Sequence, residues 1–241
     1  MTQRASAKHL AAAGWISSAS THAGCVRSCN EDRYLAREEL GLFAVADGMG
    51  GHHAGDVASA LVIDVLSDVA NMAAIEENLQ RANRQLQQRA EHASRGVVGS
   101  TVVALLVSGD EFVCLWAGDS RCYLRRDRAL AQITNDHSLV RQLVDEGRLS
   151  PREAKAHPRA NVITRAVGAL PDLILERRRG AVRTGDVFLL CSDGLWGVLD
   201  DADIAAVLEQ TPIASAADAL VALALGRRAR DNVTAVVAAR L

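Results

Sequence analysis

Four segments of this 241-residue chain share one pattern, in which an aspartate stands at the end of an apolar, strand-like run beside glycine or another turn-forming residue. A carboxylate at the end of a buried strand is held on a rigid base where the chain turns toward solvent. Several such ends at one edge of a sheet form an anionic pocket, which is unfavourable unless a cation neutralises it. The four aspartates are Asp47, Asp119, Asp193 and Asp231.

Hard oxygen ligands of this kind select Mg²⁺, Mn²⁺ or Ca²⁺ over zinc, so the pattern predicts a divalent-metal site. Gly48 follows Asp47, and the absence of a side chain there allows close backbone approach, so its carbonyl is a further candidate ligand. Any one Asp-Gly pair taken alone is also explained as a simple turn. The repetition at four strand ends favours the metal site.

A second constellation lies upstream, where Arg27 precedes Asn30, Glu31 and Asp32. The planar guanidinium of arginine matches a phosphate in bidentate geometry, so an arginine beside a carboxylate cluster indicates a phosphoryl substrate. The alternative is a surface ion pair between Arg27 and Glu31 that carries no function.

The order of the elements predicts an α+β fold, because strand patterns dominate without a regular alternation with helices. Helical spacing is expected over 58–69 and 75–92, and over 213–224, where Thr211 is the expected N-cap and Pro212 the first helical residue. Strands are expected at Gly14–Ser20, Leu42–Ala46, Thr101–Val107, Glu111–Ala117, Arg121–Arg125, Asp172–Arg178, Asp186–Cys191 and Val233–Ala239.

A helical insertion is expected between the strands, at about 136–165. Ser138–Glu146 has the pattern of a short helix closed by Gly147, and Ser150 to Glu153 forms a capping box with proline at the first helical position. No linker or repeat divides the chain, so we expect one domain over residues 1–241.

Composition excludes several classes of function. A formal net charge of −2 gives no positive field to attract nucleic acid or anionic lipid, and no apolar run approaches the ~20 residues that a bilayer span needs. The first residues are too weakly apolar for a signal peptide, so a cytoplasmic location is expected. Five cysteines without a CxxC pair fit reduced thiols, with zinc binding by Cys25 and Cys29 as the alternative. We expect a monomer.

Six motifs in order, spanning residues 24 to 232, resemble the signature set of metal-dependent Ser/Thr protein phosphatases of the protein phosphatase 2C type, in their compact bacterial form. The motifs are Arg27 with Asn30-Glu31-Asp32, Asp47-Gly-Met-Gly-Gly-His52, Gly99-Ser-Thr101, Gly118-Asp-Ser-Arg121, Ser192-Asp-Gly-Leu195 and Asp231-Asn232. The resemblance implies two packed antiparallel sheets flanked by helix pairs, a four-layer αββα sandwich with metals at one end.

The resemblance also implies roles for individual residues. Asp47 bridges two metals, Glu31 and the Gly48 carbonyl serve one of them, and Asp193 and Asp231 hold the other, so Asp47 and Asp193 are counted as catalytic. Asp119 and Asp193 hold a third, weaker metal, giving two or three Mn²⁺ or Mg²⁺ ions. Arg27 binds the substrate phosphate, and 136–165 forms a flap. The groups expected to support the ligands from behind are Asp32, Asn232 and His52.

A pair of metals would activate water for in-line attack on phosphoserine or phosphothreonine, with no cysteine nucleophile. Many eukaryotic relatives carry a histidine, the proton donor to the leaving group, where this chain has Met49. Methionine cannot donate a proton. A metal-bound water is the expected acid, with His52 as the alternative.

The expected partners are phosphorylated proteins and a bacterial Ser/Thr protein kinase that the enzyme opposes, with no nucleic acid and no membrane. One alternative is a pseudophosphatase that binds without turnover, which predicts the loss of a metal carboxylate. Another is a hydrolase of small phosphate esters, because fold alone does not decide substrate.

Overall fold

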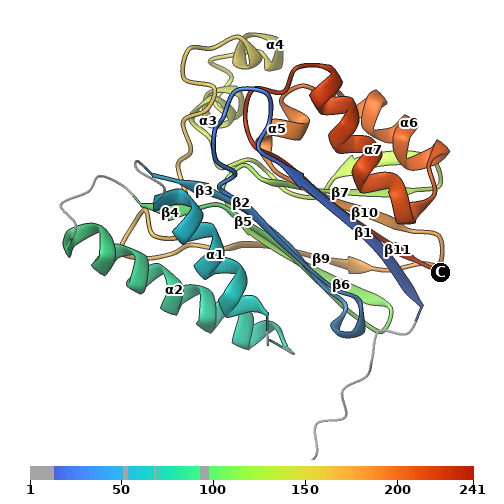
Figure 1. The fold of residues 1–241 in the computed structure, drawn as a ribbon, viewed down its shortest axis with the longest axis horizontal. Helices are drawn as coiled ribbons and strands as arrows, with labels where there is room; N and C mark the ends of the chain where they lie inside the picture. Colours follow the sequence, from blue (N-terminus) through green and yellow to red (C-terminus); the bar gives the residue numbers. More distant parts are fainter. Residues whose placement is uncertain (1–13, 51–53, 68, 70, 93–97) are drawn as a thin grey trace, which may run out of the picture.

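Two antiparallel sheets pack face to face, with helices on both outer faces, in the computed structural model of the chain (Figure 1). The structure describes residues 14–50, 54–67, 69, 71–92 and 98–241. In one sheet the strand order is β1-β11-β10-β7-β8, and in the other it is β2-β3-β5-β6-β9, with β4 paired to β3. The expected four-layer α+β sandwich is confirmed.

The first sheet consists of β1 (Trp15–His22), β11 (Val233–Arg240), β10 (Val187–Cys191), β7 (Arg121–Arg126) and β8 (Ala129–Gln132). The second consists of β2 (Asp32–Arg37), β3 (Leu42–Met49), β5 (Val102–Ser108), β6 (Glu111–Ala117) and β9 (Glu176–Ala181), with β4 (Gly99–Ser100) and a short 3-10 turn, η1 (Glu38–Leu40). Helices α1 (Ala54–Leu66) and α2 (Met72–His92) cover the second sheet, and α5 (Asp193–Trp196), α6 (Asp201–Gln210) and α7 (Ile213–Gly226) cover the first.

The buried apolar side chains form three layers that match the periodicities in the sequence. Between the sheets lie alternate strand residues such as Phe43, Val103 and Phe188. The outer face of the second sheet packs on the i, i+4 stripes of α1 and α2, which include Val62 and Leu79. The outer face of the first sheet packs on α6 and α7 in the same way. Both faces of each sheet are therefore covered, which leaves the ends of the strands as the place for a functional site.

Several of the expected boundaries are wrong. Helix α1 begins and ends before the expected 58–69. The strand expected over 172–178 begins only at Glu176, because the preceding loop is held to α2, where Gln80 Nε2 donates to the Leu173 carbonyl at 2.7 Å. Thr211 does not cap α7, whose N-cap is Pro212. The Thr211 amide instead donates to the Val207 carbonyl at 3.0 Å and ends α6, a helix that the sequence analysis did not predict.

The segment expected to be a helical insertion contains α3 (Leu139–Asp145) and α4 (Pro151–Lys155), which stand at one end of the sandwich beside α5 (Figure 1). The hydroxyl of Ser138 accepts from the Arg141 amide at the start of α3. Ser150 and Glu153 form the expected capping box at the start of α4. Both predicted helix starts are confirmed, and this segment borders the strand ends described next.

Candidate metal centre and active site

Carboxylates from both sheets meet at one end of the sandwich. Asp32 begins β2 and lies directly opposite Asp47 near the end of β3, while Asp119 follows β6. The other sheet contributes Asp193, after β10, and Asp231, before the neighbouring strand β11. Like charges opposite one another destabilise a sheet pair, so this grouping is costly in a protein without cations.

The pKa values of four of these carboxyl groups, those of Asp32, Asp47, Asp119 and Asp193, record that cost. Burial is the largest cause in each case, and it acts together with the negative charge of neighbouring aspartates. The pKa of Asp47 is raised well above its usual value by burial and by Asp32, Asp193, Asp119 and Asp231. The pKa rises to about 7 for Asp32, to about 8 for Asp119 and to about 6 for Asp193.

Asp32 is fully buried behind the cluster and is held by two hydroxyl groups. Its Oδ2 accepts from Ser192 Oγ at 2.7 Å and from Thr234 Oγ1 at 2.6 Å, which ties β2 to the two central strands of the opposite sheet. Its Oδ1 is buried with no hydrogen-bond partner. Asp32 therefore holds the start of β2 against the opposite sheet.

Asp119 sits in a turn that is held from two sides. Its carbonyl accepts from Trp196 Nε1 at 3.0 Å, and Ser120 Oγ lies 2.8 Å from Thr101 Oγ1. Gly118 has φ +120°, and a Cβ there would lie 2.6 Å from Thr101 Cβ, so only glycine fits. The side chain of Asp119 is 3% exposed, and its Oδ1 has no partner. A fixed, unpartnered carboxylate oxygen is left inside the cluster.

Gly48 lies in close backbone contact with Gly55 at the start of α1. A Cβ on Gly48 would lie 2.0 Å from the Gly55 carbonyl oxygen, and a Cβ on Gly55 would lie 2.9 Å from the carboxyl carbon of Glu31. The Gly48 amide also donates to the Glu31 carbonyl at 3.1 Å. The glycines therefore bring the Glu31 carboxylate, the Gly48 backbone and the helix start into contact.

Arg27 makes the only ion pair that reaches the cluster within the described part of the chain. Its Nε and Nη2 donate to Asp231 Oδ1 and Oδ2 at 2.9 and 2.7 Å. The loop that carries it is fixed by Asn232, whose Oδ1 accepts from the Glu31 amide at 2.8 Å and whose Nδ2 donates to the Ala23 and Cys29 carbonyls. The surface pair between Arg27 and Glu31, which the sequence left open as an alternative, is not the pair that forms.

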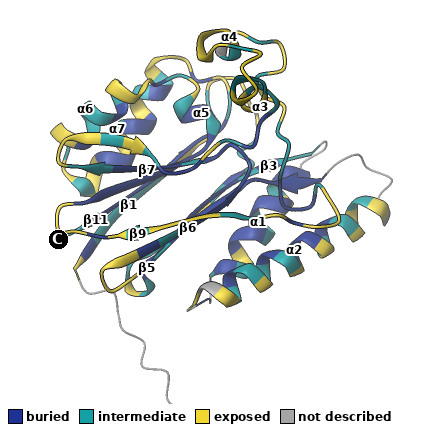
Figure 2. Cartoon of the chain, turned by 180° about the vertical axis from the view of Figure 1, so that it is seen from behind, coloured by how far each residue is buried: buried dark blue, intermediate teal, exposed yellow. Residues whose placement is uncertain are grey.

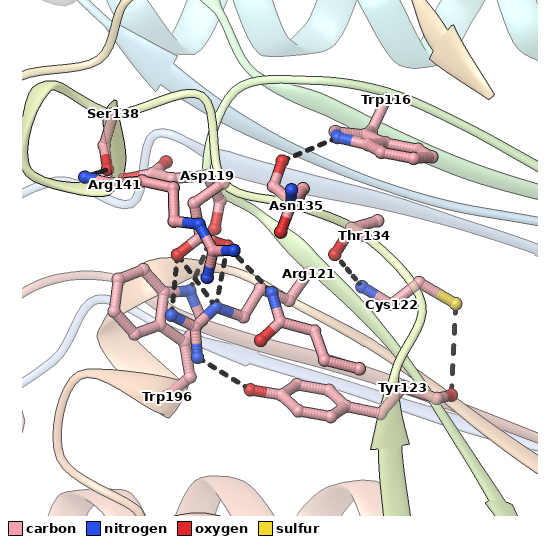
Figure 3. A network of polar contacts seen from close by, with 12 residues as sticks. Trp116, Asp119, Arg121, Cys122, Tyr123, Thr134, Asn135, Ser138, Arg141 and Trp196 are labelled. Atoms are coloured by element: carbon pink, nitrogen blue, oxygen red, sulfur yellow. Dashed lines mark hydrogen bonds and ion pairs between the residues drawn. The ribbon is translucent and has the colours of Figure 1, made fainter. Parts of the chain in front are cut away.

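The segment 136–165, the expected flap, joins this end of the sandwich through its first two residues, Asp136 and His137. Arg121 lies 3.7 Å over the Trp196 ring, donates to the Tyr123 hydroxyl and pairs with Asp136 at 2.6 Å (Figure 3). The next residue, His137, accepts from the Gly118 amide through Nδ1 at 3.1 Å, so its Nε2 carries the proton toward Glu176 Oε2 at 2.7 Å. Sequence reasoning missed these supports, as it missed the hydroxyls on Asp32.

The donor set fits divalent cations. It consists of carboxylate oxygens and the Gly48 backbone carbonyl, with two buried carboxylate oxygens unpartnered and four carboxyl pKa values raised by burial and by the neighbouring negative charges. Asp231 is engaged by Arg27, and no three Asp, Glu, His or Cys side chains of the described residues converge as a preformed ion site. A cation must therefore compete with Arg27 for Asp231.

The structure brings together nearly all the residues singled out from the sequence: Arg27, Glu31, Asp32, Asp47, Gly48, Asp119, Asp193, Asp231 and Asn232. His52 lies outside the described residues. Cys25 and Cys29, the alternative zinc ligands, are free thiols, and the other three cysteines are buried. In the described part of the chain, no helix is both long and apolar enough to cross a bilayer.

Comparison with known proteins gives a family match to "Protein phosphatase 2C" over residues 25–225. The chain is 40% identical over 224 residues to the serine/threonine protein phosphatase PstP of Mycobacterium tuberculosis, covering 89% of this chain and 43% of PstP. It is 32% identical over 236 residues to the serine/threonine phosphatase stp of Listeria innocua, covering 91% of this chain and 94% of stp.

A crystal structure of the catalytic domain of PstP in complex with two manganese ions matches with a TM-score of 0.85 and 37% identity, over 94% of this chain and 98% of that domain. The chain therefore spans less than half the length of the full PstP sequence but nearly the whole of its catalytic domain.

Proposed function

The chain belongs to the protein phosphatase 2C family, and from that membership we propose that it hydrolyses phosphoserine and phosphothreonine in proteins with the help of Mn²⁺ or Mg²⁺. The observation that carries the proposal is the meeting of five carboxylates from both sheets with Arg27 at one end of the sandwich. A relative with two manganese ions in its catalytic domain supports the choice of metal.

We propose that Asp47 contacts two ions, with Glu31 and the Gly48 carbonyl on one side and Asp193 and Asp231 on the other. Asp119 and Asp193 are the candidates for a third ion. When bound, such ions lower the pKa of a water molecule and stabilise negative charge on the phosphoryl oxygens. No carboxylate of this set is missing, which favours an enzyme over a pseudophosphatase.

Arg27 is the proposed phosphate-binding residue. Its guanidinium is 59% exposed and already holds a carboxylate in the bidentate manner that also suits a phosphate. If Asp231 were held by a cation instead, Arg27 would be free to bind the substrate phosphate. Asp32 and Asn232 act differently, because they hold the Glu31 loop and the strand ends and do not touch the substrate.

The test is phosphate release from a phosphothreonine peptide by the purified protein with Mn²⁺, compared with the same sample in EDTA and with Asp193→Asn. The proposal predicts activity that requires both the metal and Asp193. Absence of turnover on peptide and aryl phosphate, with Mn²⁺ and with Mg²⁺, would favour the pseudophosphatase.

The finer proposal is that the enzyme opposes a Ser/Thr protein kinase, as its similarity to bacterial serine/threonine phosphatases suggests. Its test is release of phosphate from an autophosphorylated bacterial Ser/Thr kinase. Turnover of phosphopeptides without turnover of any such kinase would contradict it.

A further inference from the structure

Strand β9 presents three consecutive arginines at a free edge of its sheet. Arg177, Arg178 and Arg179 are all exposed. Among the strands of the described residues, β6 alone pairs with β9, which is drawn mostly in the colour of exposed residues in Figure 2. Exposed edge strands can add a further strand from another chain, and native proteins use this for peptide recognition.

The register shows which backbone groups of β9 face outward. The Val182 amide donates to the Asp110 carbonyl at 2.7 Å, which makes these two residues a hydrogen-bonded pair. Such pairs alternate along an antiparallel ladder, so Arg178 is bonded to β6 whereas Arg177 and Arg179 direct their N–H and C=O groups away from it. Consistently, the next outward carbonyl, that of Ala181, accepts from Arg126 Nη2 at 2.7 Å.

The arginines of this edge are poorly neutralised. Arg177 lies 3.6 Å from Glu76 of α2, in an exposed pair that contributes little energy. Arg178 and Arg179 have no carboxylate partner among the described residues, although Arg178 donates to the Ile133 carbonyl. In a chain of formal charge −2, this is a local concentration of positive charge.

The strand begins beside the candidate active site. Glu176, its first residue, accepts from His137, and His137 accepts from the amide of Gly118, next to Asp119. A strand rises about 3.4 Å per residue, so Arg179 lies about 10 Å further along the edge. An extended peptide with its phosphate at the carboxylate cluster can therefore reach Arg177 and Arg179 within a few residues.

We propose that the β9 edge binds an acidic, extended segment of the phosphoprotein substrate, which adds as a strand and places alternate carboxylates opposite Arg177 and Arg179. This inference rests on the proposed phosphatase function and names a substrate class for it. A second copy of this chain is a poor occupant, because edge-to-edge pairing would bring the arginines of two copies together.

The experiment uses two phosphothreonine peptides with glutamate at alternate positions, one with the glutamates three to seven residues before the phosphothreonine and one with them three to seven residues after it. Each is compared with a partner peptide that carries glutamine at the same positions. In the wild type, KM for one of the two glutamate peptides is expected to be about tenfold lower than for its glutamine partner, since two exposed ion pairs contribute up to about fivefold each. In Arg177→Gln/Arg179→Gln the advantage falls to about twofold or less, and kcat stays unchanged.

The matched control is Arg128→Gln/Arg228→Gln, which removes the same charge from exposed positions outside β9 and should keep the preference. The wild type and both double variants should hydrolyse p-nitrophenyl phosphate at equal rates. Absence of this hydrolysis in all three would contradict the proposed phosphatase function but not peptide binding at β9. Fluorescence anisotropy of unphosphorylated glutamate and glutamine peptides tests the edge without turnover. Equal KM and equal binding of the two peptides, or a preference that survives in Arg177→Gln/Arg179→Gln, would overturn the proposal.

Discussion

The aspartates at the two ends of strand β10 differ in how their negative charge is balanced. At one end Asp186, 1% exposed, accepts from Arg126 Nε and Nη2 at 2.7 and 2.6 Å and from the Arg183 amide at 2.8 Å. At the other end Asp193 joins Asp47 and Asp119, and among the described residues the Arg27–Asp231 pair is the one ion pair within this cluster. A buried carboxylate with a structural role has hydrogen-bond and ion-pair partners within the protein, as Asp186 does at the satisfied end of β10. The carboxylates at the Asp193 end, called here the unsatisfied end, lack enough such partners, which indicates a ligand that is not protein.

The largest expected effect is on catalysis at the unsatisfied end. Asp47→Asn removes one negative charge from the carboxylate whose pKa is raised by Asp32, Asp193, Asp119 and Asp231, so cation binding should weaken and kcat/KM should fall by at least about a hundredfold. Phosphate release from a phosphothreonine peptide at saturating Mn²⁺ measures this. A variant that keeps more than a tenth of the wild-type rate would remove Asp47 from the centre of the site.

The satisfied end should show the reverse behaviour. Asp186→Ala leaves Arg126 and the Arg183 amide without their acceptor, so the free energy of unfolding should fall by about 2 kcal/mol while kcat/KM stays within about twofold. Urea denaturation and the peptide assay measure the two quantities. Loss of activity in a folded Asp186→Ala protein would show that the two ends are not independent.

The metal-free protein should lose stability as pH rises. The pKa values of Asp193, Asp32 and Asp119 are raised to about 6, 7 and 8 from an ordinary value of 3.8, so the folded protein binds more protons than the unfolded chain between about pH 4 and 8. The free energy of unfolding therefore decreases with pH in that range.

Thermal unfolding in EDTA checks the sign, with Asp119→Asn as the comparison. The variant removes one titrating carboxyl, so its Tm should lie close to the wild-type Tm near pH 4 and exceed it by an increasing amount as the pH rises to about 8. A constant difference between the two proteins across this range would contradict the raised pKa of Asp119.

The smallest expected effect concerns proton donation at the unsatisfied end. An aryl phosphate has a good leaving group that needs little protonation, so Met49→His should change its kcat by about twofold or less if the side chain at 49 is not needed as an acid. A gain of tenfold or more on p-nitrophenyl phosphate would show that the wild type lacks a proton donor.

The meeting of the aspartates at one end of the sandwich was predictable from the sequence, because strand-terminal aspartates beside glycines are local signals and topology brings strand ends together. The contacts that hold these residues in place were not predictable. The hydroxyls of Ser192 and Thr234 lie 160 and 202 residues from Asp32 in the sequence, and His137 contacts Gly118 only in the folded chain. Nothing local marks such contacts. The start of β9 was misplaced for a related reason, since α2 side chains fix the preceding loop.

The central claim is that cations complete the unsatisfied end of β10, and calorimetric titration of the metal-free protein with Mn²⁺ tests it most directly. The expected result is saturable binding of at least two ions, retained in Asp186→Ala and weakened by tenfold or more in Asp47→Asn, with protons released on binding. Absence of saturable binding in the wild type, or equal binding in Asp47→Asn, would contradict the claim.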